Sequence, residues 1–465
     1  MASTIDDAVT ALLRKLYPDF TALGDCQQLT AGASQETWRI SFTTGAGEQR
    51  LALRRAQPTA SGGSSVGQLP LATEAALFQL AGAGQIPGPE VIHVLTPDDA
   101  LGEGFIMSWL EGETLGQRIN RAEELAPARQ HLARQCGETL GRIHALDWRA
   151  LDLGEPLPDI SPAQLVQDTW AVYRDLEVPV PMIDYCWRWL TANLPTESRQ
   201  TLVHGDFRNG NLMVTPGGIE AVLDWELAHI GDPVRDLGWL CVNSWRFGQR
   251  DKPVGGFGEI DELLSGYHAT SGIEVSREEL RFWQVFGSFW WSMATLQMAN
   301  AWRTGETPSL ERPVIGRRSS EAQMDCVNLL FPGDFVLPDQ DRELSVGTQL
   351  PMPAELLQGS IEFLKNGVAS ELGGHNGFLA RVAANSLGIA QRELTFGAEL
   401  ASQEQARLAK LLGRDADLDS LREALVTQLR DGLPLDTPGL TDHLRQSVAG
   451  QLFIDQPRYS ALRKG

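Results

Sequence analysis

The chain has 465 residues, of which 42% are hydrophobic and 21% charged, and its formal net charge is −21 at pH 7. This composition is typical of a globular protein with a large core and roughly two to three domains. The acidic balance argues against nucleic acid or an anionic membrane as the main partner, because both require a basic surface. The 5 scattered cysteines, odd in number and without a C-x-x-C pair, argue against a disulfide framework or a zinc site and indicate a reducing compartment.

The N-terminal segment MASTIDDAVTALLRKLYPDF predicts an amphipathic helix and not a signal peptide. Its apolar residues recur at helical spacing behind a Ser3-x-x-Asp6 start, and acidic residues interrupt any apolar run. The most apolar stretch, residues 282–302, contains Gln284 and two further amides and is bracketed by arginines. It therefore predicts a buried core helix instead of a membrane span, and we expect a cytoplasmic protein.

Three short strands, a helix and two further strands are predicted next. The strand segments are CQQLT, TWRISF and RLALRRA, followed after a helix from about residue 69 by PEVIHVL and GFIMSWL. Beyond Gly112 the pattern becomes mostly helical. This order predicts an α+β protein of two lobes and not a doubly wound sheet. We assign residues 1–112 to a small β-rich lobe and residues 113–331 to a large helical lobe.

The composition changes in the last quarter of the chain. All 13 tryptophans precede residue 303, and the net charge is −19 over residues 1–350 but −2 over residues 351–465. Between these regions, FPGDFVLPDQDRELSVGTQLPMP has four prolines and no helical period, so we expect a linker over residues 332–350. The tail, 351–465, predicts a small all-helical accessory domain.

The segment VHGDFRNGNLMV, residues 203–214, places polar side chains between apolar strand ends. A second strand, in IEAVLDWELAHIGDPVRDLGWL, ends on Asp224. Carboxylate and amide oxygens that leave room for phosphate oxygens suit Mg²⁺. The spacing Asp206-x-x-x-x-Asn211 followed by Asp224 matches kinases, in which one Asp accepts the proton of the attacking hydroxyl. There, the Asn and the later Asp hold the metal against the nucleotide phosphates.

HGDFRNGN, LDWE and GDPVRDL together resemble the aminoglycoside phosphotransferase and choline kinase branch of the protein-kinase-like fold, across residues from about 20 to 331. The resemblance implies an ATP-dependent kinase with Mg²⁺ and a small-molecule hydroxyl acceptor. The residue roles that it implies are Asp206 as catalytic base, Asn211 and Asp224 as Mg²⁺ ligands, and His204 and Asp236 as supports of the loop. Asp232, in the G-D-P turn, is expected to be structural. ATP and GTP are not distinguished by these motifs.

The same resemblance places the nucleotide in the first lobe. Gly32 and Ser34, in LTAGASQETWRI, would cover the phosphates, although a plain hairpin turn fits the same letters. Arg54 occupies the strand position where kinases have their phosphate-binding lysine, and Glu74 is the candidate ion-pair partner.

GFIMSWLEGETL resembles the hinge of these kinases. Its backbone from Ser108 to Leu110 would then bind adenine. An ordinary edge strand is the alternative interpretation of the same residues.

The acceptor is suggested by two further resemblances. LALRR with VIGRRSSEAQMD resembles a subgroup found fused to, or working beside, acyl-CoA dehydrogenase-like enzymes, and RVAANSLGIAQREL with QLFIDQPRYSALR resembles its helical companion domain of unknown role. The subgroup implies a 4-hydroxyacyl-CoA acceptor. Arg317 and Arg318 would then help to hold CoA phosphates or form a surface basic pair. The alternatives are a kinase of an aminoglycoside, amino alcohol or sugar, and a non-catalytic kinase-like binding module.

Overall fold

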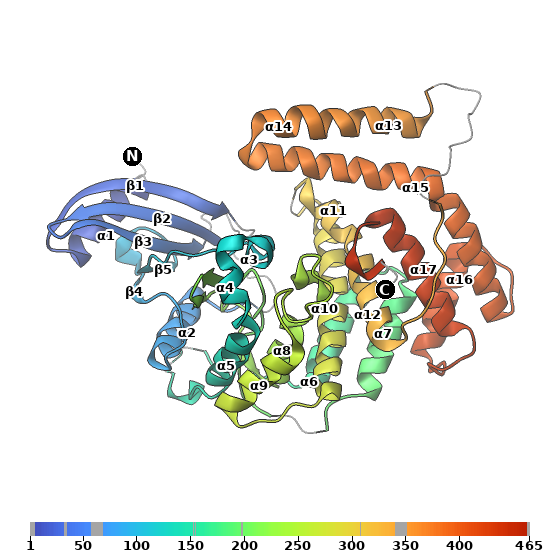
Figure 1. Ribbon diagram of the computed structural model, residues 1–465, viewed down its shortest axis with the longest axis horizontal. Coiled ribbons are helices and arrows are strands. Elements are labelled where there is room, and N and C mark those ends of the chain that lie inside the picture. Colours follow the sequence, from blue (N-terminus) through green and yellow to red (C-terminus); the bar gives the residue numbers. More distant parts are fainter. Residues whose placement is uncertain are drawn as a thin grey trace.

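The first lobe is built on a five-stranded antiparallel sheet in a computed structural model that describes residues 5–31, 35–56, 68–151, 153, 155–196, 199–306, 308–339 and 351–462 (Figure 1). The strand order is β1-β2-β3-β5-β4. The strands are β1 (Phe20–Ala31), β2 (Gln35–Thr44), β3 (Gly47–Ala56), β4 (Val91–Val94) and β5 (Gly104–Ser108). The predicted succession of strands along the chain is confirmed, because each predicted segment falls on one of these strands.

Two helices cover this sheet, and each buries a separate set of side chains. Helix α1 (Ile5–Leu16) packs its apolar face, including Leu13, on Ile40 and Leu53. Helix α2 (Leu71–Ala83) instead belongs to the main core, where Phe78 lies against Phe105. Alternate residues of β3 and β5 therefore serve two different cores, as strand geometry requires.

The second lobe is mostly helical, and a 27-residue helix, α10 (Arg277–Arg303), passes through it. The helices before it are α3 (Gly116–Arg121), α4 (Ala126–Arg129), α5 (Leu132–His144), α6 (Pro162–Asp175), α7 (Pro181–Ala192), α8 (Val234–Leu240) and α9 (Ile260–Ser271), and α11 (Glu311–Arg317) and α12 (Ser319–Leu330) follow it. Helix α10 packs against α6, α7, α8, α11 and α12. It covers the stretch predicted as a core helix, and no helix among the described residues is long and apolar enough to cross a membrane.

Two short antiparallel sheets interrupt the helices of this lobe. β6 (Thr201–Val203) pairs with β9 (His229–Gly231), and β7 (Leu212–Thr215) forms a hairpin with β8 (Gly218–Val222). The polar segments singled out in the sequence connect or follow these strands.

The tail is all-helical, as predicted. Its helices are α13 (Pro353–Glu362), α14 (Ala369–Leu372), α15 (Gly374–Leu412), α16 (Leu418–Arg430) and α17 (Leu440–Asp455). A π-helical turn, Phe363–Val368, joins α13 to α14. Two runs with helical period, residues 377–394 and the start of the run from about 400 to 431, are both parts of the 39-residue α15.

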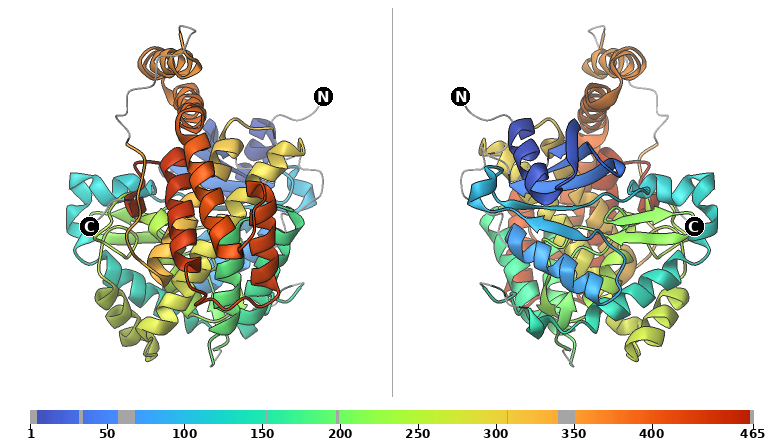
Figure 2. Two further views of the ribbon diagram at one scale, coloured as in Figure 1. Left: turned by 90° about the vertical axis from the view of Figure 1, so that its right-hand side faces the viewer. Right: turned by 90° about the vertical axis from the view of Figure 1, so that its left-hand side faces the viewer.

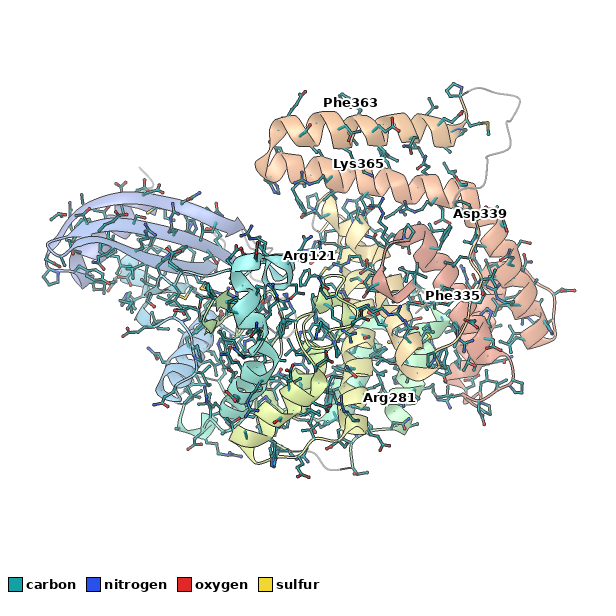
Figure 3. All side chains as sticks on the ribbon, in the orientation of Figure 1. Arg121, Arg281, Phe335, Asp339, Phe363 and Lys365 are labelled. Carbon is teal, nitrogen blue, oxygen red and sulfur yellow. The ribbon has the colours of Figure 1, made fainter. Side chains whose placement is uncertain are left out.

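The tail has two structurally different parts. Helices α13 and α14 pack against the first half of α15 and form a hairpin that projects from the body, with Phe363 67% exposed (Figures 1 and 3). The second half of α15 together with α16 and α17 forms a group of helices that we call the bundle. The bundle lies against α7, α11 and α12 (Figure 2). One continuous hydrophobic core contains residues of the second lobe and of the bundle.

Ion pairs reinforce this contact. The fully buried Asp184 of α7 accepts hydrogen bonds from Arg430 Nε at 2.6 Å and Nη2 at 3.3 Å. Arg317 of α11 pairs with Glu393 at 3.0 Å and with Asp455 at 3.2 Å. Arg317 therefore attaches the bundle to the lobe and is not a free surface cation.

Candidate active site

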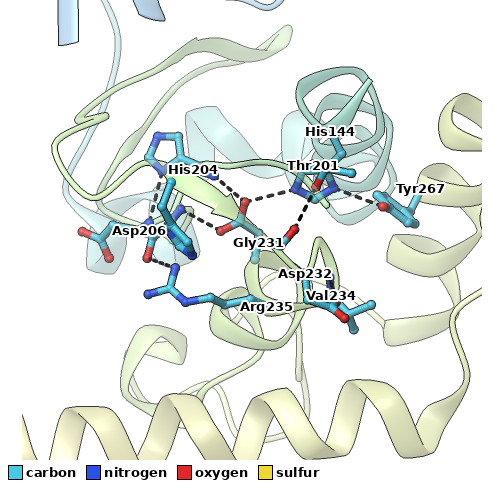
Figure 4. Close-up of polar contacts among 12 residues, drawn as sticks. His144, Thr201, His204, Asp206, Gly231, Asp232, Val234, Arg235 and Tyr267 are labelled. Carbon is cyan, nitrogen blue, oxygen red and sulfur yellow. Dashed lines mark hydrogen bonds and ion pairs between the residues drawn. The ribbon is translucent and has the colours of Figure 1, made fainter. Parts of the chain in front are cut away.

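The loop of residues 204–211, here called the HGD loop, connects β6 to β7 and is held at its start by Asp236 of α8. The Asp236 carboxylate accepts the His204 backbone N–H at 2.8 Å and the Gly205 N–H at 2.9 Å. His144 Nε2 donates to the same carboxylate at 3.1 Å, and the Tyr267 hydroxyl donates to His144 Nδ1 at 3.1 Å (Figure 4). Burial raises the pKa of Asp236, but the hydrogen bond from His144 and nearby positive charge more than offset it and bring that pKa to about 2.

His204 points inward and fixes the shape of the loop. Its Nε2–H donates to the Leu223 carbonyl at 3.1 Å, and its Nδ1 accepts the Asp206 backbone N–H at 3.2 Å. Burial lowers the pKa of His204, which favours this neutral form. Gly205 has φ +84°, and a Cβ at this position would lie 2.2 Å from the Leu227 carbonyl oxygen. Only glycine therefore fits at position 205.

The side chain of Asp206 is 14% exposed and is oriented by three donors. Trp239 Nε1 donates to Oδ1 at 2.7 Å, and Arg208 Nε donates to the same oxygen at 2.9 Å. Asn211 Nδ2 donates to Oδ2 at 2.6 Å. A carboxylate held in this way at the edge of solvent can accept a proton from a hydroxyl group placed beside it.

Asn211 and Asp224 come together across the β7–β8 hairpin. Leu212 is paired with Val222, and the Leu223 N–H donates to the Asn211 carbonyl at 2.9 Å. Asp224 then turns out of the strand with φ +66°, a conformation uncommon for residues other than glycine and often found at functional sites.

Arg54 joins the first lobe to Asp224. Its Nη2 donates to Asp224 Oδ1 at 2.7 Å, and its Nε donates to Glu74 Oε2 at 3.0 Å. Burial raises the pKa of Glu74 to about 7, against the effect of Arg54. The sequence-predicted pair of Arg54 and Glu74 is therefore present, and Asp224 is a third member.

The free oxygens around the hairpin fit Mg²⁺. Within the described residues, Asn211 Oδ1 and Asp224 Oδ2 accept no hydrogen bond. The described part of the chain has no cluster of three or more His, Cys, Asp or Glu side chains suited to a metal. A pair of oxygen ligands suits Mg²⁺, which keeps several waters and takes further oxygens from phosphates, better than it suits a cation that needs a full protein cage.

The other residues predicted to bind the nucleotide belong to the first lobe. The Ser108 amide donates to the Glu90 carbonyl at 2.8 Å and is therefore engaged within the sheet. The Leu110 amide donates to no acceptor among the described residues. Gly32 and Ser34 lie outside the described residues.

Several residues that the sequence did not single out complete the site. Glu226 Oε2 lies 3.7 Å from Arg54 Nη2, and Arg235 Nη1 donates to the Gly205 carbonyl at 2.9 Å. Asn209 Nδ2 donates to the Gly255 carbonyl at 2.8 Å. Trp239 stands three positions after Asp236, one helical turn away, and this spacing was the only local signal for it.

An aromatic cluster adjoins Asp206, in which Trp239 and Trp245 are buried and Trp290 and Trp291 are partly exposed. The ring centroid of Trp239 lies 5.0 Å from that of Trp245 and 5.3 Å from that of Trp290, and the Trp245 and Trp291 centroids are 5.2 Å apart. The Arg208 guanidinium lies 4.5 Å from the Trp245 ring centroid. Trp283, close to Trp290 and Trp291 in the sequence, is buried in the main core.

Comparison with known proteins gives two families and several relatives. Residues 25–273 match the phosphotransferase enzyme family (APH), and residues 370–459 match a domain of unknown function (DUF6285). Acyl-CoA dehydrogenase family member 10 of Mus musculus is 35% identical over 45% of this chain and 21% of its own length. The probable acyl-CoA dehydrogenase IBR3 of Arabidopsis thaliana is 24% identical over 74% of this chain and 44% of its own length. The chain thus spans less than half of either relative.

A solved structure agrees on the fold. A candidate aminoglycoside phosphotransferase from Ralstonia eutropha superposes with a TM-score of 0.54 and 21% identity, covering 69% of this chain and 96% of that one. The kinase-like fold and the helical companion domain expected from the sequence are both confirmed. The chain belongs to the phosphotransferase enzyme family, whose members use ATP and Mg²⁺ to phosphorylate hydroxyl groups.

Proposed function

We propose that this chain phosphorylates the hydroxyl group of a 4-hydroxyacyl-CoA, with Asp206 as the catalytic base. The observation that carries the proposal is the Asp206 carboxylate, oriented by Trp239, Arg208 and Asn211 and placed beside an aromatic cluster. The curated relatives named as acyl-CoA dehydrogenases support an acyl-CoA acceptor.

In the proposed mechanism Asp206 accepts the proton of the acceptor hydroxyl as its oxygen attacks the γ-phosphorus of ATP. A bond forms between that oxygen and phosphorus, the bond from phosphorus to the bridging oxygen breaks, and ADP leaves. Asn211 Oδ1 and Asp224 Oδ2 would hold Mg²⁺, which neutralises developing charge on the phosphates. Asp236 and His204 keep the loop in place through its backbone.

On the nucleotide side, Arg54 would contact the phosphates while Glu74 fixes its position. The free Leu110 amide supports adenine binding at the hinge, with Ser108 before it and Gly32 and Ser34 over the phosphates. We further propose that residues 1–112 and 113–331 form the kinase lobes, that 332–350 is a linker, and that 351–465 is the accessory domain.

The acceptor side is suited to a molecule with an apolar chain and an anionic head. Trp290 and Trp291, the partly exposed members of the aromatic cluster, offer ring surface to an acyl chain. Arg208 and Arg318, which lie over Trp245 and Trp291, would offer CoA phosphates the donors that are not used in their ion pairs with Asp206 and Glu321. The acceptor class also suggests a functional link to an acyl-CoA dehydrogenase-like enzyme.

The test is ADP release by the purified chain with MgATP across 4-hydroxyacyl-CoAs, aminoglycosides, amino alcohols and sugars. Asp206→Asn serves as the inactive variant, and Asp261→Asn, an exposed surface change, as its matched control. Turnover on an acyl-CoA that is lost only in Asp206→Asn supports both base and acceptor. Turnover only on another acceptor overturns the acyl-CoA assignment. Nucleotide binding without turnover on any acceptor would favour a binding module.

A further inference from the structure

A cavity of about 390 Å³ lies between the bundle and the second lobe. The lobe contributes the start of α7 and residues of α10, α11 and α12, and the bundle contributes residues of α15, α16 and α17. None of the HGD loop residues, Arg54 or Asp224 lines it, so it is separate from the candidate active site. Its volume is in the range of small-molecule sites.

Two polar groups in this cavity have unused hydrogen-bonding capacity. His443 is 2% exposed, and neither of its ring nitrogens has a partner among the described residues. The Nε of Arg407 is likewise without a partner there, while its Nη2 donates to Ser447 Oγ at 3.0 Å. Buried polar groups in folded proteins are nearly always paired, so these two require an explanation.

The other charges that line the cavity are already paired. Arg422 donates to Glu404 through Nε at 2.9 Å and Nη2 at 2.5 Å. Glu393 and Asp455 both pair with Arg317. Within the described residues, Arg407 is thus the lining arginine that has no carboxylate within ion-pair distance.

Burial lowers the pKa of His443 to about 4, and Arg407 and Arg422 act in the same direction against Glu404. The ring is therefore neutral and offers one N–H donor and one acceptor beside Arg407. The missing partner of this group of side chains is an anion that accepts hydrogen bonds.

The rest of the lining is partly apolar and defines the body of such a ligand. Leu296, Leu400, Leu444 and Ile454 line the same cavity. The Arg317–Glu393 pair, 42% and 43% exposed, marks its open rim. We infer that this cavity binds a small organic anion, with its carboxylate on Arg407 and His443 and its apolar part against these side chains.

A ligand in this position contacts the lobe and the bundle together. It therefore binds the docked arrangement and stabilises it by mass action. The inference does not depend on the acceptor of the kinase reaction, because its test requires no turnover.

The experiment uses the full chain with hexanoate, hexylamine and inorganic phosphate as probes, followed by thermal unfolding and calorimetric titration. Hexanoate is expected to bind and to raise the unfolding temperature, and hexylamine to do neither. Arg407→Met, which keeps the apolar stem, should weaken hexanoate at least about tenfold, as expected for a lost charge-assisted hydrogen bond. Arg414→Met, an exposed arginine of the same tail outside the cavity, should bind like the parent.

Ser447→Ala, which removes the hydroxyl that Arg407 contacts, is a second variant and should weaken hexanoate binding relative to the parent, but less than Arg407→Met does. Far-UV circular dichroism checks that each variant is folded. Absence of hexanoate binding, or equal binding by Arg407→Met, would overturn the inference. Phosphate binding as tightly as hexanoate would overturn the assignment of an apolar body.

Discussion

The HGD loop and the docking face of the bundle both bury charged groups, but they connect these groups differently. Asp236 is 32 positions from His204 and accepts backbone N–H groups of the loop. Asp184 is 246 positions from its partner Arg430, which belongs to another part of the chain. In the loop, the buried charge fixes the position of one backbone segment, whereas at the docking face it attaches two bodies. Breaking the first should cost activity, and breaking the second should cost stability.

The largest effect is expected from Asp206→Asn. Asn keeps an oxygen for the Trp239 N–H but cannot accept the proton of a hydroxyl group. We expect kcat to fall about 10²- to 10⁴-fold, the usual contribution of a general base. Nucleotide binding and the unfolding temperature should change little. A variant that keeps more than a tenth of the parental kcat would contradict the assigned base.

Arg430→Met should have the next largest effect, on stability alone. The change leaves Asp184 buried without its cation and should lower the free energy of unfolding by about 2 to 3 kcal/mol. This is below the usual range for breaking a buried ion pair, because Arg430 is partly exposed and Tyr173 still donates to Asp184. Thermal unfolding should shift down by several degrees. The double variant Asp184→Asn/Arg430→Met should recover part of this loss, because it leaves no uncompensated charge. If the double variant were less stable than Arg430→Met, the ion pair would not be the cause.

Arg54→Lys should have an intermediate effect, which we expect on the KM for ATP. Lysine keeps the charge, but a single ammonium group cannot reproduce the fork that bridges Glu74 and Asp224. We expect the KM for ATP to rise about three- to tenfold, as for one weakened charged hydrogen bond. Arg55→Lys is the matched control, since Arg55 pairs with Glu36 and not with Glu74. Equal effects of the two changes would remove Arg54 from the nucleotide site.

The smallest effect concerns pH and the docking face. Burial raises the pKa of Asp325 to about 7, although Tyr459 and Asn243 donate to it. An unfolded aspartate titrates near 3.9, so the folded state binds the extra proton. The stabilisation from this extra proton is therefore fully present below about pH 3.9 and is lost progressively as the pH rises to about 7. Asp325→Asn, which resembles the protonated form and does not titrate, should therefore have a larger stability advantage over the parent at pH 7 than at pH 5. Thermal unfolding of both proteins at the two pH values measures this difference.

Local patterns predicted much of this molecule. Alternation of apolar residues located the strands of the first lobe, and the ordered set of Asp206, Asn211 and Asp224 located the polar hairpin. These features depend on neighbours along the chain, which a single sequence contains.

Contacts between distant segments could not be predicted in the same way. Trp239 reaches Asp206 across 33 positions, and Arg430 reaches Asp184 across 246. Helix α15 joins two helical runs of the tail into one helix of 39 residues, and packing against α13 and α17 supports it along its length. The cavity at the bundle results from such long-range contacts, and no sequence motif marks it.

The core that the second lobe shares with the bundle affects how the chain folds during synthesis. Helix α7 leaves the ribosome long before α16, which covers it, and at the usual elongation rate the 246 positions between Asp184 and Arg430 take about 10 to 50 s to translate. Throughout that interval Asp184 lacks the Arg430 cation, and the side of α7 that packs on α16 is uncovered. Limited proteolysis of chains arrested before and after residue 430 should therefore show α7 becoming protected only in the longer ones. Burial of this side of the second lobe therefore waits for helices that are made much later in the chain.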